Sequence, residues 1–194
     1  MIIVSHRVNT NDKLIGTPTH FGVEIDVRSN GGKLIVQHEP CIDGEKFESW
    51  IANFHHALLI LNVKEEGLEK KLLACMKEYS IDNFFFLDQS FPFLIKTMKS
   101  GEKRSAVRVS EYESINTALS LSGKIEWVWI DSFSRFPLSD KEIGDLKDAG
   151  FRLCFVSPEV VGRIDLEEYD TFRSHVMSIA GTDDAVCTKR IEMW

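Results

Sequence analysis

The chain alternates throughout its length between short apolar runs and stretches with helical periodicity. The runs with the length of β-strands are 2–4, 22–28, 34–38, 58–63, 84–87, 106–109, 127–130, 153–156 and 185–187. Segment 34–38 follows the turn signal Asn30-Gly31-Gly32-Lys33, which predicts a hairpin with 22–28. The remaining eight runs are nearly all separated by a helix or a connection of helical length, which favours a parallel sheet.

Eight such units predict an α/β fold closed into a (β/α)8 barrel, and a doubly wound open sheet is the alternative. The chain has 194 residues, whereas a barrel of this type usually needs roughly 200 or more. We therefore expect a compact barrel with trimmed connections. No linker or repeat divides the sequence, so residues 1–194 are predicted to form a single domain.

Composition and charge narrow the classes of function. The net charge is −7, with acidic and basic residues interleaved, which predicts no nucleic-acid partner. No apolar run approaches the roughly 20 residues of a membrane span, so no stable membrane association is expected. The start of the chain does not resemble a secretory signal, and its four cysteines are scattered, which predicts reduced thiols, mostly in the core, and a cytoplasmic location. Oligomeric state is left open.

The polar residues at the ends of the first strands carry the chemical signal. Glu24 and Asp26 are two apart on one predicted strand, so both carboxylates point to the same face. Two carboxylates inside a barrel need a compensating cation or base, and paired oxygen ligands suit Mg²⁺ or Ca²⁺. The alternative is an acidic strand edge that faces solvent.

His6 and Arg7 follow the first strand, and His38 ends the hairpin arm. Two histidines beside a carboxylate pair and an arginine form a general acid–base set around a phosphate clamp, although either histidine alone could be structural. Asn62 and Lys64 repeat the two-residue spacing on the next strand. Lys64 could bind a phosphate oxygen or form a salt bridge with one of the carboxylates.

Four segments of the first third of the chain resemble one enzyme family. They are "SHR", "GVEIDVR", "GGKLIVQHEP" and "LNVK". In this order they resemble the glycerophosphodiester phosphodiesterases, within the superfamily of phosphatidylinositol-specific phospholipases C and spider-venom sphingomyelinases D. Later segments, 86–91 and 184–188, resemble the family more loosely.

The resemblance implies an eight-stranded barrel that hydrolyses a small polar phosphodiester with one divalent cation, Mg²⁺ or Ca²⁺. The site residues it implies are His6 and His38 as the acid–base pair, Arg7 and Lys64 on the phosphate, and Glu24, Asp26 and Asn62 around the cation.

Several departures from the family pattern accompany the resemblance. Asn62 stands where the family has Glu or Asp in an (E/D)-x-K motif, and Val8 replaces a glycine. The family's Glu-Asn-Thr segment is absent, although Asn9-Thr10 stands nearby, and a tryptophan of the seventh strand is missing. The sequence therefore leaves a second hypothesis open, a barrel that binds a phosphate ester without turning it over.

Overall fold

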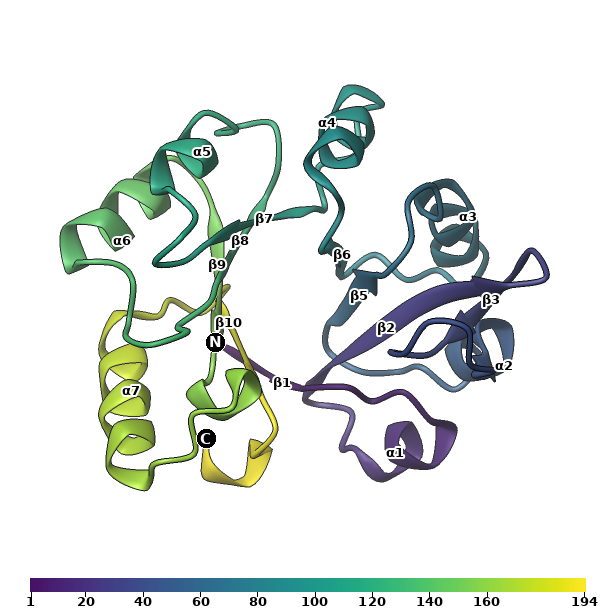
Figure 1. Ribbon diagram of the computed structural model, residues 1–194, viewed down its shortest axis with the longest axis horizontal. Helices are drawn as coiled ribbons and strands as arrows, with labels where there is room; N and C mark the ends of the chain where they lie inside the picture. Colours follow the sequence, from purple (N-terminus) through teal and green to yellow (C-terminus); the bar gives the residue numbers. More distant parts are fainter.

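A computed structural model describes residues 1–194, and its central feature is a ring of eight parallel strands (Figure 1). These are β1 (Ile2–Ser5), β2 (Gly22–Asn30), β5 (Leu59–Val63), β6 (Phe84–Leu87), β7 (Ala106–Val109), β8 (Trp127–Ile130), β9 (Arg152–Val156) and β10 (Ala185–Thr188). Each lies beside its successor along the chain, and β10 pairs with β1. A doubly wound sheet requires a reversal of strand order, so the barrel prediction is confirmed.

The junction between β6 and β7 is the weakest of the ring. It consists of one parallel bridge, between Phe86 and Ser105, and the backbone N–H of Phe86 donates to the carbonyl of Arg104 at 2.9 Å. The two neighbouring junctions have four residue pairs each. The barrel therefore has a seam at this position.

The helices cover the outside of the ring (Figure 1). They are α1 (Asn11–Gly16), α2 (Phe47–Ile51), α3 (Glu69–Glu78), α4 (Phe91–Lys99), α5 (Ile115–Leu119), α6 (Asp140–Asp148) and α7 (Leu166–Ile179), with short 3₁₀ turns at Pro158–Val161 and Ile191–Met193. Three of them, α1, α2 and α5, have only five or six residues, which is how a short chain completes eight units. A capping box of Ser139 with Glu142 begins α6.

The predicted hairpin is also present. Gly31 and Gly32 have φ of 55° and 79°, the left-handed region that a two-residue hairpin turn requires. The second arm, β3 (Lys33–Val36), ends two residues before the predicted boundary and pairs with β4 (Glu45–Lys46). His38 therefore lies in a loop, held beside β2 because the N–H of Gln37 donates to the carbonyl of Asp26 at 2.9 Å.

The barrel interior is filled by alternate strand residues. Val4, Phe85, Trp127 and Cys154 belong to one buried cluster inside the ring, and two further clusters lie between the strands and the helices. Trp127 and Trp129 are both buried in the cluster inside the ring. All four cysteines are free, but Cys41 is exposed, so the expectation of a core position is wrong for this residue. No helix combines the length and hydrophobicity that crossing a bilayer requires.

Candidate active site

Strand alternation directs the two predicted carboxylates into the barrel. On β2, Val23, Ile25 and Val27 pack on the helix side, so Glu24 and Asp26 face inward at the carboxyl end of the strand. Both carboxylates are fully buried. This excludes the alternative of a solvent-facing acidic edge.

Glu24 accepts two hydrogen bonds. The backbone N–H of Arg7 lies 2.8 Å from Oε2, and Nδ2 of Asn62 lies 3.0 Å from Oε1. Nε2 of His6 is 3.7 Å from Oε2. Burial, reinforced by the negative charge of Asp26, raises the pKa of Glu24 to about 7.

Asp26 lies in a much more cationic environment. Asn9 brackets it, donating from Nδ2 to Oδ2 at 2.8 Å and accepting from the Asp26 N–H at 3.0 Å. Nδ1 of His38 and Nζ of Lys64 lie 3.2 Å and 3.3 Å from Oδ1. Burial raises the pKa of Asp26, but the Asn9 hydrogen bond and the charge of Lys64 outweigh it, so the pKa falls below its ordinary value. Asp26 is therefore the more acidic carboxyl of the pair.

The two histidines occupy opposite sides of this carboxylate pair. His6 is mostly buried and its Nδ1 has no hydrogen-bond partner. The pKa of His6 is lowered to about 3, mainly by burial and then by the positive charges of Arg7 and Lys189. Its imidazole is therefore neutral at neutral pH. His38 is about one third exposed, and Arg7 Nη2 donates to its Nε2 at 2.9 Å. Because a guanidinium can only donate, the Nδ1–H of His38 faces Asp26.

The backbone of Arg7 makes this arrangement possible. Arg7 has φ of 54°, a turn that lets its N–H reach Glu24 while its side chain extends toward His38 and Asp26. Trp50 supports the turn from α2, donating from Nε1 to the carbonyl of Val8 at 3.0 Å in the buried core.

Lys64 links the carboxylate pair to the seam of the barrel. Its Nζ lies 3.3 Å from Asp26 and 3.4 Å from Oδ2 of Asp88, so the predicted salt bridge to one carboxylate exists. Asp88 in turn pairs with Arg108, which also contacts Asp131. Burial raises the pKa of Asp131 to about 6 despite the opposing charge of Arg108.

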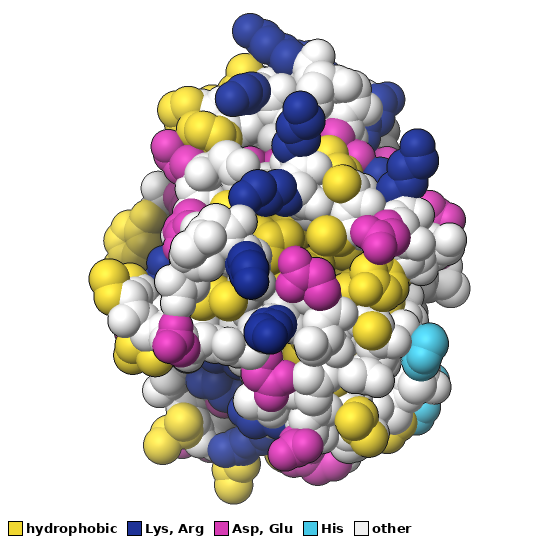
Figure 2. All heavy atoms as spheres, turned by 90° about the vertical axis from the view of Figure 1, so that its right-hand side faces the viewer, with side chains coloured by type: hydrophobic (Ala, Val, Ile, Leu, Met, Phe, Trp, Pro, Cys, Tyr) yellow, Lys and Arg dark blue, Asp and Glu magenta, His cyan; other side chains and the backbone are white.

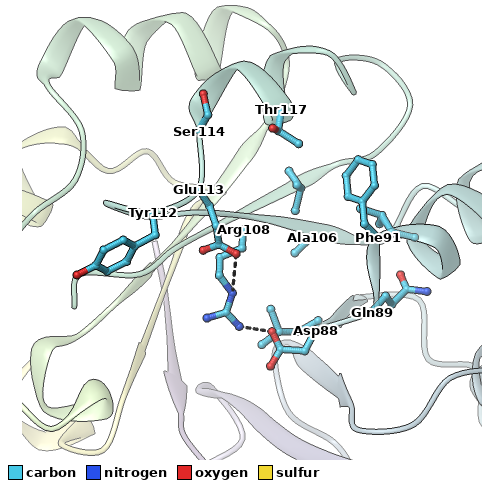
Figure 3. A pocket seen from close by; sticks show the side chains of 12 residues that line it. Asp88, Gln89, Phe91, Ala106, Arg108, Tyr112, Glu113, Ser114 and Thr117 are labelled. Atoms are coloured by element: carbon cyan, nitrogen blue, oxygen red, sulfur yellow. Dashed lines mark hydrogen bonds and ion pairs between the residues drawn. The ribbon is translucent and has the colours of Figure 1, made fainter.

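A cavity of about 520 Å³ opens at the seam between β6 and β7. Figure 3 shows Arg108 at its floor, held between Glu113 and Asp88, with the rings of Tyr112 and Phe91 on its walls. Asp88 follows β6 and Arg108 lies near the end of β7, and no site was predicted from the sequence at this position.

The side chains of this site offer oxygen donors to a divalent cation. No three His, Cys, Asp or Glu side chains are arranged to hold a metal ion together, and the third predicted ligand is the neutral amide of Asn62. Oδ1 of Asn62 is nevertheless buried without a hydrogen-bond partner. Two carboxylates and an unsatisfied amide oxygen are the hard donors that Mg²⁺ and Ca²⁺ prefer, so the residues fit such a cation with one negative charge fewer than three acids would give.

All seven predicted side chains thus meet at the mouth of the barrel. Asn9 also belongs to the site, because it both donates to and accepts from Asp26, and no role was predicted for it. The signal that could have identified it is its place in Asn9-Thr10, the remainder of the family's Glu-Asn-Thr segment.

Two solved structures share this architecture. The glycerophosphodiester phosphodiesterase of Agrobacterium tumefaciens strain C58 superposes with a TM-score of 0.72 and 14% identity, covering 100% of this chain and 98% of that one. A glycerophosphoryl diester phosphodiesterase of Parabacteroides distasonis gives a TM-score of 0.58 and 10% identity, covering 98% and 84%. The chain has the glycerophosphodiester phosphodiesterase fold. No protein-family model and no curated protein sequence matches it, so the likeness is one of structure at low identity.

Proposed function

We propose that this chain is a metal-dependent phosphodiesterase that hydrolyses a small polar phosphodiester. The observation that carries the proposal is the convergence of His6, His38, Arg7 and Lys64 on the buried pair Glu24–Asp26 at the carboxyl ends of the strands. Barrel enzymes place their chemistry at this end. The likeness to two solved phosphodiesterases supports the same class of reaction.

Glu24, Asp26 and Asn62 would hold the cation, with the Asn62 amide turned so that its oxygen faces the site. A divalent cation there would neutralise charge on the phosphoryl oxygens and polarise phosphorus toward attack. Lys64 would keep Asp26 ionised whether or not the cation is bound, because its ammonium lies 3.3 Å away.

Arg7 and Lys64 would bind the phosphate. Arg7 is 45% exposed on its side chain, so it can turn from His38 toward a ligand. A planar guanidinium can hold two phosphoryl oxygens at once, which fixes the orientation of the diester.

The two histidines would move the protons. His6 is neutral at rest and available to take a proton from the nucleophile, either water or a neighbouring substrate hydroxyl. Once Arg7 turns to the phosphate, Nε2 of His38 would be free to take up a proton from solvent and pass it to the leaving alkoxide, and Asp26 at Nδ1 would stabilise the charged ring.

Purified protein with Mg²⁺ or Ca²⁺ should cleave bis-p-nitrophenyl phosphate or glycerophosphocholine. His6→Ala and His38→Ala should each lower kcat by about 10²–10⁴, the usual contribution of a general acid or base. His55→Ala is the matched control, since His55 is exposed and makes no contact with the site.

Absence of turnover over a broad panel of phosphodiesters, with cation present, would refute the proposal. Phosphate-ester binding without cation binding or turnover would favour the alternative of a non-catalytic barrel, which the neutral Asn62 motivates.

The proposal also covers the cellular location of the protein and its partners. The four free cysteines support a reducing compartment, so we propose a cytoplasmic location and a small-molecule substrate, with neither nucleic acid nor membrane as partner.

A further inference from the structure

We propose that a cationic cavity beside the active site binds a second anionic group of the substrate, a phosphate or carboxylate carried by one of its alcohols. The inference rests on the proposed phosphodiesterase function and narrows its substrate class. The cavity lies between the end of β1, helix α1 and the end of β10, and its volume is about 550 Å³.

The charge of this lining is one-sided. Arg7, Lys13 and Lys189 line the cavity together with His6, and no aspartate or glutamate does. The chain as a whole carries a net charge of −7, so the positive charge of this lining is opposite in sign to that of the whole protein. Figure 2 shows the contrast: on the face that carries α2 and α3, lysine and arginine side chains are interspersed with acidic ones.

Neither lysine is neutralised by a carboxylate. Nζ of Lys189 donates to the backbone carbonyls of Glu159 and Val160, at 3.1 and 3.3 Å. The carboxylate of Glu159 is already engaged by Ser157, Thr188 and the Lys189 N–H. Lys13 makes no side-chain hydrogen bond or ion pair, and its ammonium is exposed. Both charges therefore remain available to an anion.

The cavity is continuous with the reacting centre, because His6 and Arg7 line it and also contact Glu24 and His38. The seam cavity on the other side has two acids, Asp88 and Glu113, around one arginine. A diester with one anionic alcohol would bind with that alcohol toward β10.

Two matched substrate pairs test the proposal. Glycerophosphoserine differs from glycerophosphoethanolamine by one carboxylate, and bis(glycerophospho)glycerol differs from glycerophosphoglycerol by one added glycerophosphate. The ratio of kcat/KM, anionic over matched substrate, should exceed one in each pair. Lys13→Gln should lower that ratio about tenfold, the effect of one charge-assisted hydrogen bond, and Lys189→Gln should lower it further. Lys99→Gln, an exposed lysine on α4, is the control and should leave the ratio unchanged.

A binding measurement separates this proposal from the catalytic one. Calorimetric titration with glycerol 3-phosphate and with glycerol 1,3-bisphosphate reports the second anion without turnover, and Lys13→Gln should weaken only the preference for the bisphosphate. Ratios near one in the unmodified protein, or ratios that Lys13→Gln does not change, would overturn the subsite. If no diester is hydrolysed but the bisphosphate preference depends on Lys13, the proposed function fails and the anion site stands.

Discussion

Glu24 is expected to lower the stability of this protein at neutral pH, and its replacement by glutamine should reveal the cost. In the folded protein the pKa of Glu24 is about 7, whereas in the unfolded chain it returns to its ordinary value of 4.5. Between these values the folded state binds more protons than the unfolded state, so rising pH favours unfolding. The stabilising contribution of the protonated carboxyl is complete below the lower value and lost as pH rises through the upper one.

The magnitude follows from the size of the shift. A difference from 4.5 to about 7, at 1.36 kcal/mol for each pKa unit, corresponds to about 3 kcal/mol. Glu24→Gln removes this penalty without adding an unpaired polar atom, provided that the Asn62 amide turns. The Gln oxygen can accept from the Arg7 N–H, and its amide can donate to Asn62 Oδ1, which has no hydrogen-bond partner.

Urea unfolding at pH 5 and pH 8 in the presence of a chelator measures the effect, with the buried Trp127 and Trp129 as fluorescent probes. Relative to the unmodified protein, Glu24→Gln should gain about 2–3 kcal/mol more at pH 8 than at pH 5, while losing phosphodiesterase activity. Asp26→Asn is the matched control of opposite sign. It should destabilise at pH 8, because Asp26 has a lowered pKa and loses its pairing with Lys64 and His38.

A stability difference between Glu24→Gln and the unmodified protein that is the same at both pH values would refute this reasoning. It would mean that the Glu24 carboxyl titrates alike in the folded and unfolded states, and that burial beside Asp26 does not govern its proton.

Three other substitutions probe the site. Asn62→Asp adds a third carboxylate beside Glu24, so calorimetry should record at least about tenfold tighter Mg²⁺ or Ca²⁺ binding, and equal affinity would contradict the assigned ligand set. Asn9→Ala removes both hydrogen bonds between Asn9 and Asp26, so the free energy of unfolding should fall by about 1–3 kcal/mol. The pKa of Asp26 should rise, which should move the acidic limb of the pH–activity profile to higher pH. An unshifted profile would contradict the role of Asn9 in keeping Asp26 ionised. Trp50→Phe leaves the Val8 carbonyl without its buried donor, so we expect the free energy of unfolding to fall by about 1–2 kcal/mol and kcat to fall as well. An unchanged kcat would show that support of the Arg7 turn by Trp50 does not matter for catalysis.

The order of strands in the ring was predictable because hydrophobic periodicity is a local property. Runs such as Phe84–Leu87 and Trp127–Ile130 are apolar at every position, as strands buried on both faces must be. Helices α1 and α2 escaped prediction because five or six residues are too few to establish a period. His38 was predicted to end a strand but lies in a loop, because the pairing of β3 with β2 and with β4 stops at Val36.

The two-residue spacing of Glu24 and Asp26 placed both carboxylates on one face, and the strand-end positions of His6, Asn62 and Lys64 predicted that they would meet there. Whether that face points inward depends on which side of the sheet the helices cover, so burial had to come from the structure.

The sequence alone determined the eight-unit barrel and the set of residues at its mouth, because strand period and chain order are encoded residue by residue. Only the tertiary structure decided how those residues divide their charge. The pKa of Glu24 is raised by burial, whereas the pKa of Asp26 is lowered because Asn9, Lys64 and His38 surround its carboxylate. The approach of Lys13 and Lys189 to His6 is likewise tertiary, because residues 13 and 189 come together only when β10 closes against β1. Electrostatic interactions depend on distance in space and on burial, and the spacing of residues along the chain determines neither of them.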